Sequence, residues 1–218
     1  MYTIVNLLEN MGQALRIPTS FVVIEFIGTF AFALSGIRLA SAKQFDVFGA
    51  WIVGMATAIG GGTLRDLMLG LRPFWMTNSS YFICCAVAVL WVMLFRKYMV
   101  RQNNAWFIFD TIGLALFNVI GIEKTLNLGL PAWTAITMGG VTGAGGGIIR
   151  DVLINEVPLI FRKEIYAMAC VAGGLIYVAG GELGMGPNAN AFLSSLTVII
   201  IRILAVKHHW HLPVVKGE

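Results

Sequence analysis

The sequence GGGTLRD at residues 60–66 returns as GGGIIRD at residues 145–151. Each copy lies inside a long apolar segment, where three consecutive glycines and an adjacent Arg-Asp pair are unusual. Glycine weakens a helix and uncovers its backbone, and a charged side chain at bilayer depth is costly and by default functional. The two copies therefore predict two discontinuous membrane helices that line one conduction or transport path.

The composition is that of a membrane protein. Of the 218 residues, 58% are hydrophobic and 12% are charged, and the mean hydropathy is +0.81, whereas soluble domains carry about 25% charged residues. The net charge of +4 comes without a basic stripe of interleaved aromatic residues, so we expect no nucleic-acid partner. Cys84, Cys85 and Cys170 lie in apolar runs without metal-ligand spacing, so we predict no metal site and no cofactor.

Seven segments are apolar and long enough to be membrane helices, which need about 20 residues each. They span residues 21–40, 45–71, 81–95, 106–122, 130–154, 165–178 and 191–206. Residues 184–190 are expected to form a loop, and the stretch before Pro18 is expected to form a short interfacial helix. The predicted fold is an all-α integral membrane protein, in which residues 1–218 form a single membrane domain.

A shift of 85 positions aligns two parts of the chain without a gap. It superimposes Gly28 on Gly113, Phe32 on Phe117, Pro73 on Pro158 and Tyr81 on Tyr166. We assign the first repeat to about residues 20–98, the second to about 105–182, and an additional seventh helix to about 190–206. Because each repeat holds three helices, the second should cross the membrane in the opposite sense, a plan common among transporters.

The positively charged residues predict the orientation of the chain, because cytoplasmic loops carry an excess of Lys and Arg. The segments after the first, third, fifth and seventh helices hold Arg38, Lys43, Arg96, Lys97, Arg101, Arg162, Lys163, Lys207 and Lys216. The opposite side holds Arg16, Arg72 and Lys124. We therefore expect the N-terminus outside and the C-terminus in the cytoplasm.

Two explanations fit the glycine triplets. The triplets are Gly60, Gly61, Gly62, Gly145, Gly146 and Gly147. Small residues let two membrane helices approach closely. A break or kink fits adjacent glycines better, because they point in three directions around a helix, and backbone freed at membrane depth survives only inside protein or beside a water-filled cavity. Freed carbonyls can coordinate a cation, and helix N-termini favour anionic groups.

The charged pairs after the triplets are the candidate pore-lining or gating residues. They are Arg65, Asp66, Arg150 and Asp151. Adjacent residues on a helix do not face each other, so we do not expect an ion pair within either Arg-Asp dipeptide. The inverted repeat suggests instead that the Arg of one copy pairs with the Asp of the other. Such pairs would either pin the two helices together or gate the path and set its charge selectivity.

Two further carboxylates, Glu25 and Asp110, lie about one turn into the first helix of each repeat. Helix N-termini favour carboxylates, so helix capping or an interfacial position accounts for them. The alternative is a cation-attracting vestibule at each end of the path. The sequence shows no Ser-His-Asp, Cys-His or paired-carboxylate constellation, so we do not expect an enzyme.

With both glycine-Arg-Asp copies at this spacing, the chain resembles the prokaryotic members of the trimeric intracellular cation channels, also described as glycine-transporter-domain membrane proteins. The resemblance covers about residues 20–206. It implies a homotrimer in the bacterial inner membrane, with a separate pore in each protomer. The second and fifth helices, kinked at the triplets, would line that pore, and it would carry monovalent cations, chiefly K⁺ and possibly Na⁺.

Three functions therefore remain open at the level of sequence. The first is a passive cation channel, which requires each Arg beside the path to be paired with a carboxylate or turned away. The second is a secondary transporter of glycine or another small zwitterion, in which Arg holds a carboxylate and Asp an ammonium group. The third is a structural membrane subunit without a path.

Overall fold

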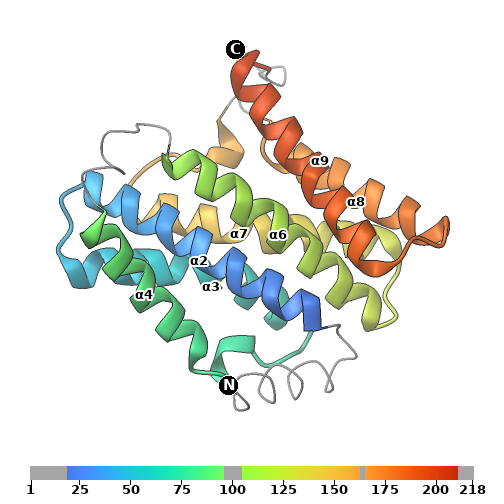
Figure 1. Ribbon diagram of the computed structural model, residues 1–218, viewed down its shortest axis with the longest axis horizontal. Helices are drawn as coiled ribbons and strands as arrows, with labels where there is room; N and C mark the ends of the chain where they lie inside the picture. Colours follow the sequence, from blue (N-terminus) through green and yellow to red (C-terminus); the bar gives the residue numbers. More distant parts are fainter. Residues whose placement is uncertain (1–18, 96–104, 163–164, 211–218) are drawn as a thin grey trace, which may run out of the picture.

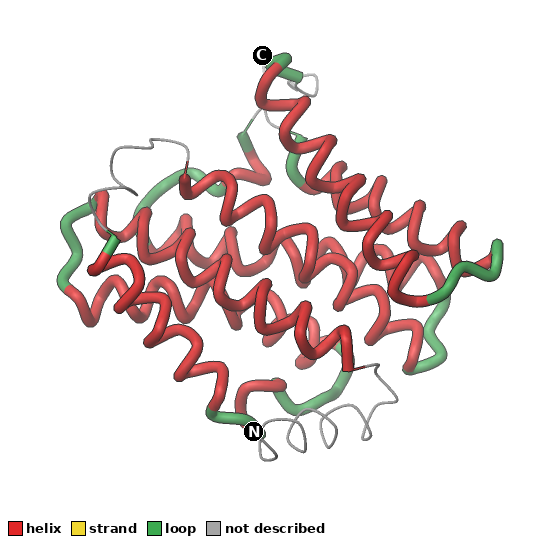
Figure 2. Tube along the Cα trace, in the orientation of Figure 1, coloured by secondary structure: helices red, strands yellow, loops and turns green. Residues whose placement is uncertain are grey.

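The chain folds into α-helices. The structure, a computed structural model, describes residues 19–95, 105–162 and 165–210 (Figure 1). Within these ranges there are seven α-helices, two short 3-10 helices and no strand (Figure 2). The elements are α2 (Thr19–Ala42), α3 (Val47–Met68), η1 (Phe74–Met76), α4 (Ser80–Leu94), α6 (Ala105–Asn127), α7 (Ala132–Leu153), η2 (Leu159–Phe161), α8 (Ala167–Glu182) and α9 (Pro187–Lys207). The predicted all-α fold is confirmed, whereas the helix expected before Pro18 lies outside the described residues.

The predicted helix boundaries agree with the structure to within a few residues, with two exceptions. α6 continues past Glu123 and Lys124 to Asn127, because both charged side chains find partners on neighbouring helices. α9 begins at Pro187, inside the stretch expected to be a loop, since proline is favoured in the first turn of a helix. Among the described helices, α2, α3, α6 and α9 are long and apolar enough to cross a membrane, and α4 and α8 are shorter apolar helices.

The two repeats contact each other reciprocally. The ring of Phe32 in α2 stacks on that of Phe117 in α6 with centroids 5.4 Å apart. Gly28 faces Phe117, and the matching Gly113 faces Phe32. Such exchange of equivalent partners is what a two-fold axis produces, and α2 and α6 run in opposite directions (Figure 1). The inverted three-helix repeats are therefore confirmed.

The predicted break in the second and fifth helices is wrong. α3 and α7 are each one continuous α-helix of 22 residues, and the triplets lie inside them. Each glycine in a helix interior costs about 1 kcal/mol relative to alanine. Close packing offsets this cost, because α3 and α7 cross with their backbones in contact at the triplets. Of the two explanations for the glycine triplets, the structure therefore supports close approach of the two helices.

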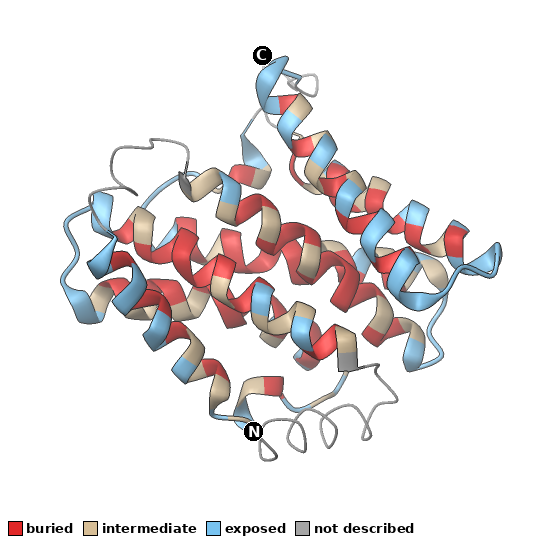
Figure 3. Ribbon diagram, in the orientation of Figure 1, coloured by how far each residue is buried: buried red, intermediate tan, exposed pale blue. Residues whose placement is uncertain are grey.

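The buried residues form a continuous core at the centre of α2, α3, α6 and α7. Figure 3 shows this core, while α8 and α9 lie at one edge of the bundle. α9 packs against α8 and α6 and has no equivalent in the first repeat. The structure is therefore symmetric at its centre and asymmetric at the edge that α9 covers.

Candidate functional site

The crossing of α3 and α7 is built by the middle glycine of each triplet. A Cβ atom placed on Gly61 would overlap the carbonyl oxygen of Thr142 and lie 3.0 Å from the backbone nitrogen of Gly146. A Cβ atom on Gly146 would in turn overlap the carbonyl oxygen of Thr57. Only glycine therefore fits at the two positions where the repeats meet.

The first and third glycines of each triplet make room for side chains. A Cβ atom on Gly60 would lie 2.7 Å from the Cδ1 atom of Ile149, and one on Gly62 would lie 2.5 Å from the ring of Phe74. In the second repeat, a Cβ atom on Gly147 would lie 2.8 Å from the Tyr166 hydroxyl. Each triplet thus faces three different neighbours, which explains why three adjacent glycines are needed.

One turn beyond the first triplet lies the first charged cluster, formed by Arg65, Asp66, Glu25 and Lys124. Arg65 is fully buried, and its Nε atom donates to Asp66 Oδ1 at 2.8 Å. Lys124 Nζ from α6 donates to the same oxygen at 2.9 Å. Glu25, which is half-buried, accepts a hydrogen bond of 2.9 Å from the Tyr81 hydroxyl and interacts electrostatically with Arg65 and Lys124.

The second charged cluster is formed by Arg150, Asp151, Asp110 and Arg202. Arg150 Nε donates to Asp151 Oδ1 at 2.8 Å, and Arg150 Nη1 donates to Asp110 Oδ1. Arg202 of α9 approaches Asp110 Oδ2 at 3.9 Å. Arg150, Asp110 and Arg202 are fully buried. Asp110 therefore lies inside the bundle, between two arginines, and not in an open vestibule.

Neighbours from inside and outside the second repeat complete the second cluster. The Ser35 hydroxyl of α2 accepts a hydrogen bond of 2.9 Å from Arg150 Nη1. The guanidinium of Arg202 lies 4.6 Å from the ring centroid of Tyr166 and 4.9 Å from that of Phe107. Such cation–π contacts hold a buried guanidinium without a further carboxylate. The second cluster is thus held by α2, α6, α7 and α9 together.

Both aspartates also cap the turn that follows their helix. Asp66 Oδ2 accepts from the backbone N–H of Phe74 at 2.9 Å, and Asp151 Oδ2 accepts from that of Leu159 at 3.0 Å. Phe74 and Leu159 begin η1 and η2, which follow Pro73 and Pro158. A carboxylate is favoured at the N-terminus of a helix. Each Asp therefore ties the end of a long helix to the short helix after it.

The predicted pairing of the arginines is wrong. Arg65 pairs with Asp66 of its own dipeptide, and Arg150 pairs with Asp151, whereas no ion pair joins an Arg of one copy to the Asp of the other within the described residues. Cβ atoms of adjacent residues do point apart. The arginine side chain is long enough to fold back so that its Nε atom reaches the neighbouring carboxylate.

Each cluster contains two cationic and two carboxylate groups, so its formal charges balance. Sequence reasoning missed Lys124 and Arg202, which supply the second cation of each cluster. The available signal was that Lys124 and Arg202 are charged residues in apolar helices, and a charge in such a helix by itself indicates a functional site. Burying an ion pair is costly unless further hydrogen bonds satisfy its members. The backbone, Ser35 and tyrosine contacts provide part of these bonds, whereas Nη1 and Nη2 of Arg65 have no hydrogen-bond partner among the described residues.

A small cavity of about 250 Å³ leads from the surface to Asp151 of the second cluster. Lys43 and Glu156 lie among its lining residues and form an ion pair of 2.5 Å, and Arg162 binds Glu156 at 3.2 Å. The Lys43 ammonium holds the pKa of Glu156 below its usual value through a hydrogen bond and charge attraction. A solvent-exposed ion pair between the two repeats therefore forms part of the wall of this cavity.

The fold and these clusters define a class: helical membrane proteins built from inverted repeats that cross at glycines beside buried, balanced charges. A family model with the description Glycine transporter matches residues 22–97 and 107–181, which correspond to the two repeats. The chain belongs to this family, that of the prokaryotic trimeric intracellular cation channels.

Relatives match along nearly the whole chain. A UPF0126 membrane protein of Vibrio cholerae is 40% identical over 88% of this chain and 81% of its own length. The inner membrane protein YadS of Escherichia coli is 38% identical over 87% of this chain and 93% of its own. The E. coli relative is thus named for the inner membrane, which agrees with the helical spans of this chain.

Solved structures agree in fold. The trimeric intracellular cation channel orthologue from Rhodobacter sphaeroides matches with a TM-score of 0.84 and 31% identity, over 88% of this chain and 100% of that one. A prokaryotic TRIC channel in 0.5 M KCl matches with a TM-score of 0.81 and 30% identity, over 88% of this chain and 98% of that one. These structures are ion channels and not enzymes, which agrees with the sequence.

Proposed function

We propose that this chain is a channel for monovalent cations, chiefly K⁺, with a pore inside each protomer beside the crossing of α3 and α7. The observation that carries the proposal is the match of 88–91% of this chain to solved cation channels at 30% identity or above. The reciprocal glycine contact of Gly61 and Gly146 supports it. By the same likeness, we propose that three copies of the chain assemble. The name of the E. coli relative supports the inner membrane as their location, and the distribution of Lys and Arg supports a cytoplasmic C-terminus.

The charged clusters remove the main objection to a cation path. An unpaired arginine beside the path would repel cations. Arg65 pairs with Asp66, and Arg150 pairs with Asp110 and Asp151. The balanced charge of each cluster supports cation permeation past both arginines.

The opening movement would occur at the triplets. In this conformation the backbones of α3 and α7 touch, so a path must run beside the crossing or the helices must separate. Three adjacent glycines weaken the helix by about 3 kcal/mol relative to alanines. We infer that α3 and α7 bend at Gly60–Gly62 and Gly145–Gly147 when the pore opens, which is where the kink was expected.

The ion pair of Lys43 with Glu156 supports the proposed orientation. Lys43 follows α2 and Glu156 follows α7, and their contact at 2.5 Å places both segments on one side of the bundle. The inverted repeat requires these two segments to lie on one side, because the segments after the first and fifth helices should face the same compartment. The excess of Lys and Arg on that side makes it the cytoplasmic side.

Planar-bilayer recording of the purified protein in a KCl gradient tests the channel. We expect discrete currents whose reversal potential lies toward the K⁺ equilibrium potential. Replacing K⁺ by Na⁺ then measures selectivity among cations. A reversal potential toward the Cl⁻ equilibrium potential would contradict the proposal.

One observation favours a second function, the transport of glycine or a similar zwitterion. The Nη1 and Nη2 atoms of Arg65 are buried and have no hydrogen-bond partner among the described residues. A guanidinium with two free donors can bind the carboxylate of a substrate in a bidentate manner. Glu25 lies close enough to Arg65 to interact with it electrostatically. Saturable uptake of labelled glycine into proteoliposomes, without unitary currents, would select this function over the channel.

A further inference from the structure

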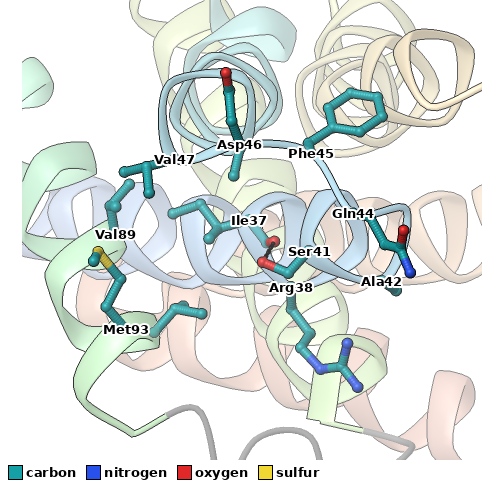
Figure 4. Close-up of a pocket in the computed structure, with 12 residues that line it drawn as sticks. Ile37, Arg38, Ser41, Ala42, Gln44, Phe45, Asp46, Val47, Val89 and Met93 are labelled. Atoms are coloured by element: carbon teal, nitrogen blue, oxygen red, sulfur yellow. Dashed lines mark hydrogen bonds between the residues drawn. The ribbon is translucent and has the colours of Figure 1, made fainter.

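A larger cavity, of about 720 Å³, lies where α2, α3 and α4 come together at one end of the bundle. Figure 4 shows Ile37 and Arg38 of α2, Val47 of α3, and Val89 and Met93 of α4 around it. This volume falls within the range of about 300–1,000 Å³ typical of ligand sites. It is separate from the charged clusters and from the crossing of α3 and α7.

The matching position in the second repeat is filled. Shifting by 85 positions places Val92 on Tyr177 and Arg38 on Glu123. Tyr177 is only 4% exposed, and its hydroxyl donates a hydrogen bond to Glu123. The first repeat therefore has a cavity because it carries the smaller valine where the second carries a tyrosine, and the charge beside it is positive instead of negative.

We propose that this cavity binds the headgroup of an anionic phospholipid. Its apolar rim faces outward, since Val47 is 56% and Met93 is 54% exposed in the single chain, and outward apolar side chains of a membrane protein can contact lipid. Arg38 supplies the positive charge, and arginine suits phosphate because its planar fork donates two hydrogen bonds. The lipid's glycerol and upper acyl chain would cover the valines and the methionine.

The negative group in the wall does not oppose this ligand. The Asp46 carboxylate accepts the backbone N–H of Gly49 at 2.6 Å, where it caps α3. In Figure 4, Asp46 and Arg38 extend to opposite sides of the cavity. The cavity also lies on the side with the excess of Lys and Arg, and basic pockets between membrane helices on that side bind lipid headgroups.

Native mass spectrometry of the detergent-solubilised protein, equilibrated with equal amounts of phosphatidylglycerol and phosphatidylcholine, tests the proposal. We expect preferential retention of phosphatidylglycerol by the wild-type chain. The double variant R38E/V92Y copies the Tyr177–Glu123 pair of the second repeat, so it should fill the cavity, remain folded and lower phosphatidylglycerol retention about tenfold, equivalent to about 1.4 kcal/mol.

A second variant keeps the test decisive if the double variant does not fold. R38Q leaves the cavity open and removes the positive charge of Arg38, so retention of phosphatidylglycerol should fall to the level of phosphatidylcholine. Wild-type retention in folded R38E/V92Y, or an unchanged lipid preference in R38Q, would overturn the proposal. So would a wild-type chain that retains neither lipid. The result does not depend on whether the protein conducts.

Discussion

Lys124 of α6 and Asp66 of α3 form an ion pair of 2.9 Å between the two repeats, and both side chains are buried. In the second cluster the additional cation is Arg202, which comes from α9. The two clusters therefore share three repeat-related members and differ in the fourth. Both clusters include a contact between the repeats, through Lys124 in the first and Ser35 in the second, but only the second also depends on the additional helix.

Removing the Lys124 charge should destabilise the protein. In Lys124→Met, Asp66 keeps Arg65 but loses one partner, and breaking a buried ion pair typically costs about 3–5 kcal/mol. We expect a clear fall in melting temperature in detergent. Lys124→Arg keeps the positive charge and serves as the control, with a much smaller loss. Equal stability of Lys124→Met and the wild type would show that this ion pair contributes nothing to the folded state.

A methyl group at the crossing should separate α3 from α7. In Gly61→Ala the added Cβ atom would overlap the carbonyl oxygen of Thr142, and backbone on both sides cannot move aside cheaply. We expect a loss of about 1–3 kcal/mol from overpacking and altered single-channel currents. Gly140→Ala is the matched control, because it lies in α7 with nothing within 4 Å of its Cβ position.

Gly140→Ala should be neutral or slightly more stable, since alanine favours a helix by up to about 1 kcal/mol over glycine. Melting temperatures and bilayer recordings of the two variants side by side measure both effects. If Gly61→Ala behaves like Gly140→Ala, the crossing is not the tightly packed contact that the structure shows.

The surface ion pair at the smaller cavity should respond to pH and salt. Lys43 lowers the pKa of Glu156 in the folded protein, so the stabilisation is present above the ordinary glutamate pKa. It is lost as the pH falls through the lowered value. The difference in melting temperature between wild type and Glu156→Gln should therefore be present at pH 7 and shrink as the pH falls below the ordinary glutamate pKa of about 4.3.

High salt provides an independent check on the same pair, because exposed charges are screened within about 3 Å at 1 M salt. The difference between wild type and Glu156→Gln should shrink at high KCl. A difference that persists unchanged at low pH and high salt would mean that Glu156 acts through packing and not through charge.

The orientation of the chain can be measured directly. A reporter enzyme that is active only in the cytoplasm, fused after Glu218, should be active, and one that requires the periplasm should not. Moving the same reporters to the turn between α3 and η1, after Leu71, should give the opposite result. A periplasmic signal at Glu218 would reverse the proposed direction of both cavities.

Most of the fold was predictable because its signals are local. Apolar length defines the helices, and the register of 85 positions that relates Phe32 to Phe117 defines the repeats. An odd number of helices per repeat then requires the inversion. The end of α6 was predicted too early, because charged Glu123 and Lys124 signal a helix end unless partners from distant helices are known.

Whether the helices are continuous at the triplets could not be predicted, because that depends on packing against a helix distant in the sequence. Three glycines destabilise an isolated helix, and only the approach of Gly146 to Gly61 shows the close packing that accompanies two continuous helices. The ion pairs were equally non-local. The reach of an arginine side chain and the contribution of Arg202 from α9 depend on tertiary structure, so no spacing rule would have placed them.

The reciprocal contact at Gly61 and Gly146 limits how the two halves can evolve. A substitution at this contact alters the surface through which the two repeats pack, so the packing of both repeats must accommodate it. Away from the axis the halves can diverge independently, as Arg38 and Glu123 have done by adopting opposite charges. At that pair the two copies of one sequence no longer offer their surroundings the same charge.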